Sequence, residues 1–169
     1  LQASEVLGAD LRLQSPDVIG EEYAAEAERR GLRTARVAST LSVVGVGDRT
    51  QLSNVHAVSD GYPLRGGVRI SAEPFGEPDI ATDIPAPGEV WLDSRLLAAL
   101  GARVGDVVTI GSVELRVTRA LISRPDQGSG FTDLAPSLLM NDADLAATKL
   151  IQPGSRVRYA ALFAGDRNQ

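Results

Sequence analysis

His56 is the only histidine in the chain, so it is the first residue to consider for acid–base or metal chemistry. A zinc site needs three or four close ligands, and the chain has no cysteine to supply thiolates. A Ser-His-Asp hydrolase would use His56 as its base, but no Gly-x-Ser-x-Gly turn accompanies it. We therefore interpret His56, within the apolar run NVHAV, as a structural histidine and expect no catalytic residue.

The segment between Arg69 and Arg95 has no positive charge but contains six acids and four of the nine prolines. Paired carboxylates there suggest glycoside chemistry or a calcium site. The acids lack the Asp-x-Asp-x-Asp-Gly spacing that gathers oxygens around calcium, and the chain has no Gly-x-x-x-x-Gly-Lys phosphate loop. We interpret the segment as a solvated loop or lobe crossing and expect no metal and no cofactor.

Two further strings suggest contacts or a hinge. The run 62–67 combines an aromatic residue, a proline and two glycines, which is typical of a hinge turn between lobes; a partner contact is the alternative. The run 124–131 has the composition of an exposed loop whose one aromatic residue could be a docking anchor. The candidate hinge or partner contacts are Tyr62, Pro63, Leu64, Arg65, Arg124 and Phe131.

Composition and charge exclude several classes of protein. The 22 acids outnumber 17 scattered bases, giving a net charge of −5, so we expect no nucleic-acid partner. The longest uncharged stretch, 37–47, is far shorter than the roughly 20 residues of a membrane-spanning helix. With no initiator methionine and no signal sequence, the chain is expected to be cut from a longer gene.

The elements that must position these residues begin with a predicted strand over 8–14, with Leu11 and Leu13 on one half-buried face. Ser15 followed by Pro16 predicts the start of a helix that ends at Gly31. Two further strands are predicted over 34–46 and 52–59, joined by a turn.

The stretch 87–117 is a folding unit without catalytic groups. It predicts a strand over 89–92, a helix over 94–100 between the N-cap Asp93 and the stop Gly101, and a hairpin that turns at Gly111. A short strand over 137–140, a helix capped by Asn141 and a last strand over 156–164 complete the chain.

Several of these motifs in this order resemble one known family. They are GADLRLQSPD, VHAVSDGYPLRGG, PGEVWLDSRLLAALGARVGDVVTIG, the Arg124-Pro125-Asp126 run and PGSRVRYAALFAG. The chain resembles the MacB-like periplasmic core domain of FtsX-type ABC transporter permeases, and its nearest branch is the YbbP-like permeases, predicted to work with a lysophospholipase or thioesterase.

The resemblance implies an α+β fold. A porter-like α/β lobe, built from both chain ends (1–66 and 153–169), would carry an inserted mixed α/β, Sabre-like lobe (67–152) that contains a β-hairpin. In the family the porter-like lobe continues with another helix and strand, so we expect it to be truncated at Gln169.

The resemblance also implies a function. The domain would lie on the periplasmic side of the cytoplasmic membrane, anchored by the transmembrane part of a larger permease whose ATPase is a separate cytoplasmic subunit. It would couple ATP-driven helix motion to handling of a hydrophobic or lipid-linked cargo, or of a periplasmic partner such as a lysophospholipase or thioesterase. A receptor with an interlobe groove is the alternative, and a hydrolase is less favoured.

Overall fold

The computed structural model describes residues 8–125 and 134–165, which form a mixed α/β fold that consists mostly of sheet. In chain order the elements are β1 (Leu11–Ser15), α2 (Glu21–Arg29), β2 (Arg33–Val46), β3 (Arg49–Val58), β4 (Arg69–Ser71), β5 (Asp79–Ile80), β6 (Glu89–Asp93), α3 (Ser94–Leu100), β7 (Val107–Ile110), β8 (Val113–Ser123), β9 (Ser137–Asn141), the 3-10 turn η2 (Asp142–Asp144), α4 (Leu145–Thr148) and β10 (Arg158–Ala164). None of the helices in the described ranges has the length and apolar character needed to cross a membrane.

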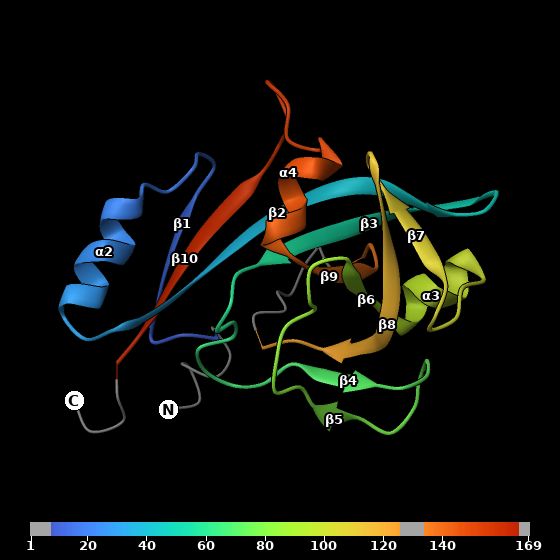
Figure 1. The fold of residues 1–169 in the computed structure, drawn as a ribbon, viewed down its shortest axis with the longest axis horizontal. Coiled ribbons are helices and arrows are strands. Elements are labelled where there is room, and N and C mark those ends of the chain that lie inside the picture. Colours follow the sequence, from blue (N-terminus) through green and yellow to red (C-terminus); the bar gives the residue numbers. More distant parts are fainter. Residues whose placement is uncertain (1–7, 126–133, 166–169) are drawn as a thin grey trace.

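A long hairpin, β2 with β3, runs across the molecule (Figure 1). Its antiparallel register pairs Val46 with Arg49 around the predicted turn, where Gly47 adopts a φ of 57°. The first half of β2 pairs with β10, whereas Val44 near its far end pairs with Ile110 of β7. One strand is therefore shared by two regions of the sheet.

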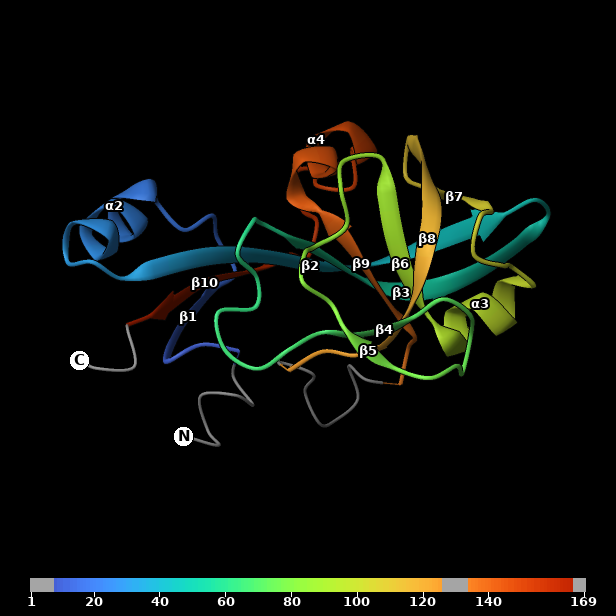
Figure 2. The same cartoon turned by 60° about the horizontal axis from the view of Figure 1, so that its bottom comes forward.

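The region at the far end of the hairpin is a closed ring of strands (Figure 2). Pairing runs β2–β3–β9–β6–β8–β7 and returns to β2, so six strands close on themselves. We call this region the closed ring. It encloses the main core, in which α3 contributes Leu96, Leu97 and Leu100.

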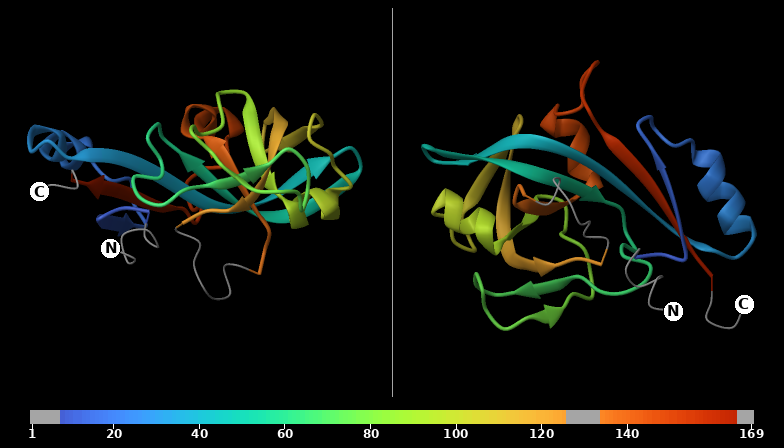
Figure 3. Two further views of the ribbon diagram at one scale, coloured as in Figure 1. Left: turned by 90° about the horizontal axis from the view of Figure 1, so that it is seen from below. Right: turned by 180° about the vertical axis from the view of Figure 1, so that it is seen from behind.

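The other region is an open sheet formed by β1, β10 and the first half of β2, with α2 against β2 (Figure 3). We call it the open sheet. A small cluster of Ala27, Ala161 and Phe163 joins α2 to the strands. On edge strand β1, Leu11 is 62% exposed and Leu13 is also exposed, so the half-buried face predicted for this strand is wrong.

The predicted helix start at Ser15 is also wrong. Ser15 is still paired with Tyr159 in the sheet, and its hydroxyl accepts a hydrogen bond from the Asp17 amide at 3.0 Å. This local turn uses the hydroxyl that was expected to cap the helix. The helix instead begins at Glu21 after Gly20, and its end just before Gly31 is confirmed.

The structure confirms the elements predicted within 87–117. The Asp93 carboxylate accepts the Leu96 amide proton at 2.7 Å, and Gly101 ends α3 in the left-handed region. Gly111 turns the β7–β8 hairpin where a Cβ atom would lie only 2.1 Å from the Thr148 carbonyl oxygen. The short strands β4 and β5, in the acid-rich segment, were not predicted.

The two predicted lobes belong to one continuous sheet. The closed ring takes β2 and β3 from before residue 67, and a second core cluster joins Val37, Tyr62 and Leu162 to Trp91 and Leu139. The division at 66/67 and 152/153 stays a prediction.

Candidate functional site

The predicted hinge lies between the two regions of the sheet. Tyr62 and Leu64 are buried in the second core cluster, and the Tyr62–Pro63 peptide bond is cis. With Pro63, Tyr62 lines a cavity of about 580 Å³ against residues 80–87. We call it the hinge cavity. As they stand, these side chains pack the core, and their role as hinge or partner contacts stays a prediction.

Arg65 joins both ends of the described chain. Its Nε and Nη2 donate to Oδ1 and Oδ2 of Asp10 at 3.1 and 3.0 Å, and its guanidinium also donates to the Gly165 carbonyl oxygen. The Gly165 amide donates to the same Asp10 carboxylate at 3.0 Å. The Arg65 side chain is 16% exposed and that of Asp10 is 41% exposed, so the two-point ion pair is half-shielded, on its Arg65 side. We call it the Arg65 clamp.

His56 is buried between Ser39 and Arg124. Its Nδ1 lies 2.7 Å from Ser39 Oγ, and its Nε2 lies 2.9 Å from Arg124 Nη2. Because a guanidinium can only donate, Nε2 must be the acceptor, and these partners place the ring proton on Nδ1. The imidazole thus donates to Ser39 and cannot take its proton, which argues against a Ser39–His56 nucleophile.

No metal site is evident in residues 8–125 and 134–165, where no group of three or more His, Asp and Glu residues is placed to hold an ion. The acid-rich segment instead contributes to structure. Asp93, for example, caps α3 and also accepts the Ser137 amide proton at 2.8 Å.

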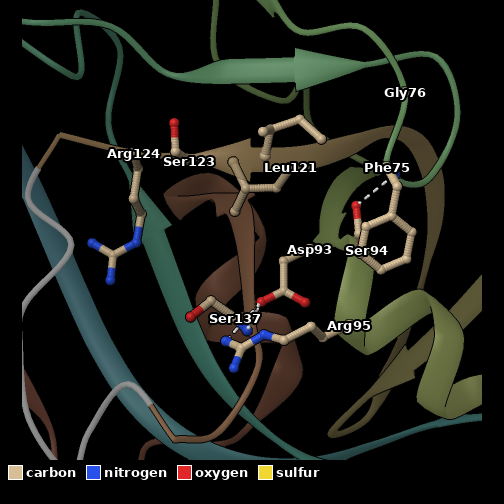
Figure 4. Close-up of a pocket in the computed structure, with 10 residues that line it drawn as sticks. Phe75, Gly76, Asp93, Ser94, Arg95, Leu121, Ser123, Arg124 and Ser137 are labelled. Atoms are coloured by element: carbon tan, nitrogen blue, oxygen red, sulfur yellow. Dashed lines mark hydrogen bonds and ion pairs between the residues drawn. The ribbon is translucent and has the colours of Figure 1, made fainter.

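A second cavity, of about 440 Å³, opens where β6 ends and α3 begins (Figure 4). We call it the β6-end pocket. Its walls are the end of β8, the start of β9 and the loop between β4 and β5. The lining residues are Phe75, Gly76, Asp93, Ser94, Arg95, Leu121, Ile122, Ser123, Arg124 and Ser137.

The structure brings only some of the predicted site residues together. Tyr62 and Pro63 share the hinge cavity, Arg124 lies in the β6-end pocket, and Phe131 lies outside the described residues. Phe75 and Arg95 of the pocket were missed. The signal for Phe75 was available, because it is an aromatic residue in a polar, proline-containing run, as Phe131 is.

Comparison with known proteins agrees with the family resemblance. No protein-family model matches the chain. Over 168 residues, 99% of the chain, it is 34% identical to "Uncharacterized ABC transporter permease YbbP" of Escherichia coli (strain K12), and it spans about a fifth of that protein's length (20%). The periplasmic region of MacB from Actinobacillus actinomycetemcomitans superposes with a TM-score of 0.58 at 11% identity, over 98% of this chain and 80% of that one.

The two comparisons are independent, since one rests on sequence along the whole chain and the other on the fold. The structural match agrees with the mixed, sheet-rich architecture described above. Together the comparisons show that the chain is similar in sequence to part of an ABC transporter permease and in fold to the periplasmic region of MacB.

Proposed function

We propose that this domain is a non-catalytic coupling element on the periplasmic side of the cytoplasmic membrane. It passes ATP-driven motion of the permease's transmembrane helices to a hydrophobic or lipid-linked cargo, or to a periplasmic partner such as a lysophospholipase or thioesterase. An ABC permease works with an ATPase, and here that subunit would be cytoplasmic and connected through the transmembrane part.

The Arg65 clamp carries this proposal. It holds Asp10, near one end of the described chain, and Gly165, near the other, to a residue of the predicted hinge. If both ends lead to membrane helices, a displacement of those helices acts first on this clamp. Arg65 is the shared partner of Asp10 and Gly165, so loss of its side chain removes contacts to the two ends at once.

The β2–β3 hairpin supplies a path from the clamp to the closed ring. Val37 of β2 and Val58 of β3 pack in the same core cluster as Leu64, beside Arg65. Farther along, Val44 of β2 is part of the ring and of its core. A shift of the open sheet would therefore pass along β2 and change its position relative to the ring.

The polar groups described above support a non-catalytic role. The His56 proton is directed at Ser39, Asp93 is used by two backbone amides, and Arg65 is paired with Asp10. Each of these three side chains therefore has a structural partner, and none is paired in a way that would activate a substrate.

Distance measurements in the complete permease with its ATPase, in lipid, test the proposal. This chain has no cysteine, so once any cysteines in the rest of the complex are replaced, a spin-label pair at Glu28→Cys and Arg103→Cys reports the distance between the open sheet and the closed ring. We expect the distance distribution to change between the ATP-bound and nucleotide-free states. An identical distribution in both states would contradict coupling through this domain.

A second variant tests the clamp itself. Arg65→Gln should abolish or strongly reduce the nucleotide-dependent change, because it removes the two-point pair with Asp10. Arg69→Gln removes the same charge from an exposed position nearby and should leave the change intact. If both variants behave alike, the clamp is not the point of coupling.

A receptor role is the second candidate, and the hinge cavity favours it. The cavity's volume of about 580 Å³ lies within the range of small-molecule sites. Calorimetry of the domain with lipids and with candidate partner proteins tests this role, which requires saturable binding that Tyr62→Ala or Ile84→Ala weakens.

A further inference from the structure

The β6-end pocket lies where β6 ends and turns into α3 while β8 continues. The last β6 pairings join Asp93 to Leu121 of β8 and Leu92 to Leu138 of β9. Beyond Asp93 the chain turns into α3, while β8 continues to Ser123. β9 begins at Ser137, level with Asp93, so β8 alone extends past this end of β6 and forms one wall of the pocket.

Positive charge predominates among the lining side chains. Among the described lining residues, Arg95 and Arg124 are basic and Asp93 is the one acid. The Asp93 carboxylate accepts two backbone amides at 2.7 and 2.8 Å and forms an ion pair with Arg95 at 3.5 Å. In a chain of net charge −5, the described lining residues therefore carry one net positive charge.

Arg124 is held in position by His56. The buried imidazole accepts from its Nη2 at 2.9 Å, and an imidazole that accepts at Nε2 and holds its proton on Nδ1 is neutral, so it orients the guanidinium without cancelling its charge. Arg95, with its side chain 54% exposed, reaches the same pocket from the first turn of α3 (Figure 4). Guanidinium groups bind carboxylate and phosphate oxygens in preference to neutral groups.

An apolar wall lies beside these charges. Phe75 is 72% exposed at the pocket, and Leu121 and Ile122 line its β8 side. Phe75 has a φ of 57°, a strained backbone conformation for an aromatic residue. The Phe75 amide donates to Ser94 Oγ at 3.0 Å, and this partly buried hydrogen bond holds Phe75 at the pocket.

From these observations we propose that the β6-end pocket binds an organic oxyanion, a carboxylate or a phosphate ester, that carries an apolar group. Arg95 and Arg124 bind the anionic oxygens, and Phe75 with Ile122 packs against the apolar group. This site is independent of the coupling role, because ligand binding and force transmission use different residues.

Titration of the complete 169-residue chain by ¹⁵N NMR tests the site with four probes: hexanoate, hexyl phosphate, hexanol and inorganic phosphate. Saturable shifts are expected at the amides of Ser94, Ser123 and Ser137 with hexanoate or hexyl phosphate. The two anions distinguish a carboxylate from a phosphate ligand. Hexanol and inorganic phosphate should each bind at least about tenfold more weakly, because each lacks half of the recognition.

Arg95→Gln should weaken hexanoate or hexyl phosphate binding about tenfold, the loss expected for a charge-assisted hydrogen bond. Arg103→Gln removes an equal charge at an exposed site away from the pocket and should leave affinity unchanged. Equal affinity in the wild-type chain and the Arg95 variant would overturn the proposal, as would hexanol binding as tightly as hexanoate or the absence of saturable shifts.

Phe75→Gly separates binding from folding. Glycine adopts a φ of 57° without strain, so the urea midpoint of unfolding should not fall, while affinity for the anions falls at least about fivefold. A variant that keeps full affinity would show that the aromatic side chain is not part of the site.

Discussion

The closed ring and the open sheet share β2 but bury their apolar side chains in different ways. The ring encloses a cluster of sixteen buried residues of its own. The open sheet buries one side in the second core cluster, which it shares with the ring, and the cluster between α2 and the outer strands has only three buried residues. Leu11 and Leu13 on β1 remain exposed. The comparison indicates that the ring has a core of its own, whereas the open sheet is stabilised mainly through the core that it shares with the ring.

Truncation of a core leucine should break this comparison most directly. Leu96→Ala, in the ring core and fully buried, should lower the free energy of unfolding by about 2–5 kcal/mol because it leaves a cavity. Leu11→Ala, on the open sheet, should cost less than about 0.5 kcal/mol. Urea denaturation measures both changes, and equal losses would show that the two regions contribute alike.

Two glycines with nearly the same φ provide a matched pair. Gly47 (φ 57°) turns the β2–β3 hairpin with nothing within 4 Å of an added Cβ, whereas at Gly111 (φ 56°) that atom would meet the Thr148 carbonyl oxygen at 2.1 Å. Gly47→Ala should cost about 1–2 kcal/mol, the backbone strain alone.

Gly111→Ala should cost a further ~1–3 kcal/mol, since the backbone around Thr148 must move. Thermal and urea denaturation of the two variants give the difference. If the losses are equal, the ring tolerates displacement at this contact and is less tightly packed than described.

Asp93 tests how firmly α3 closes the ring. Asp93→Ala removes the acceptor for the amides of Leu96 and Ser137, and should lower the free energy of unfolding by about 1–3 kcal/mol. Asp93→Asn keeps one acceptor oxygen and should show an intermediate loss in the same urea titration. An Asn variant as destabilised as the Ala variant would mean that the charge, and not the hydrogen-bond geometry, is what matters.

The smallest effect is expected on the exposed face of α2. Glu26 pairs with Arg29 at 2.6 Å and with Arg30 at 2.9 Å, and all three side chains are substantially exposed. Glu26→Ala should therefore change the free energy of unfolding by no more than about 0.5 kcal/mol, and less at high salt. A loss above about 1 kcal/mol would show that the open sheet contributes more to the free energy of unfolding than its small buried cluster indicates.

Local signals predicted the elements of the ring well. Asp93, Gly101 and Gly111 act within a few residues of themselves, so their caps and turns can be inferred from the sequence. The pairings that close the ring join distant segments, such as Val44 with Ile110 and Val55 with Leu138. No periodicity in a single strand indicates which partner it will have.

The same limit explains the failures. Ser15 has the residue type of a helix cap, but pairing of β1 with β10 keeps it in the sheet. The β6-end pocket gathers Phe75, Arg95, Arg124 and Ser137 from four segments, and only Arg124 was singled out from composition. A site that depends on where one strand ends relative to two others has no signature in any one of them.

Closure of the ring by a hairpin from outside residues 67–152 has an evolutionary consequence. A gene fragment encoding that stretch alone would lack two of the ring's six strands and would present the bare edges of β7 and β9, which tend to aggregate. The stretch could not have been exchanged between proteins as an independent module. Any recombination that kept it functional had to carry the β2–β3 hairpin as well.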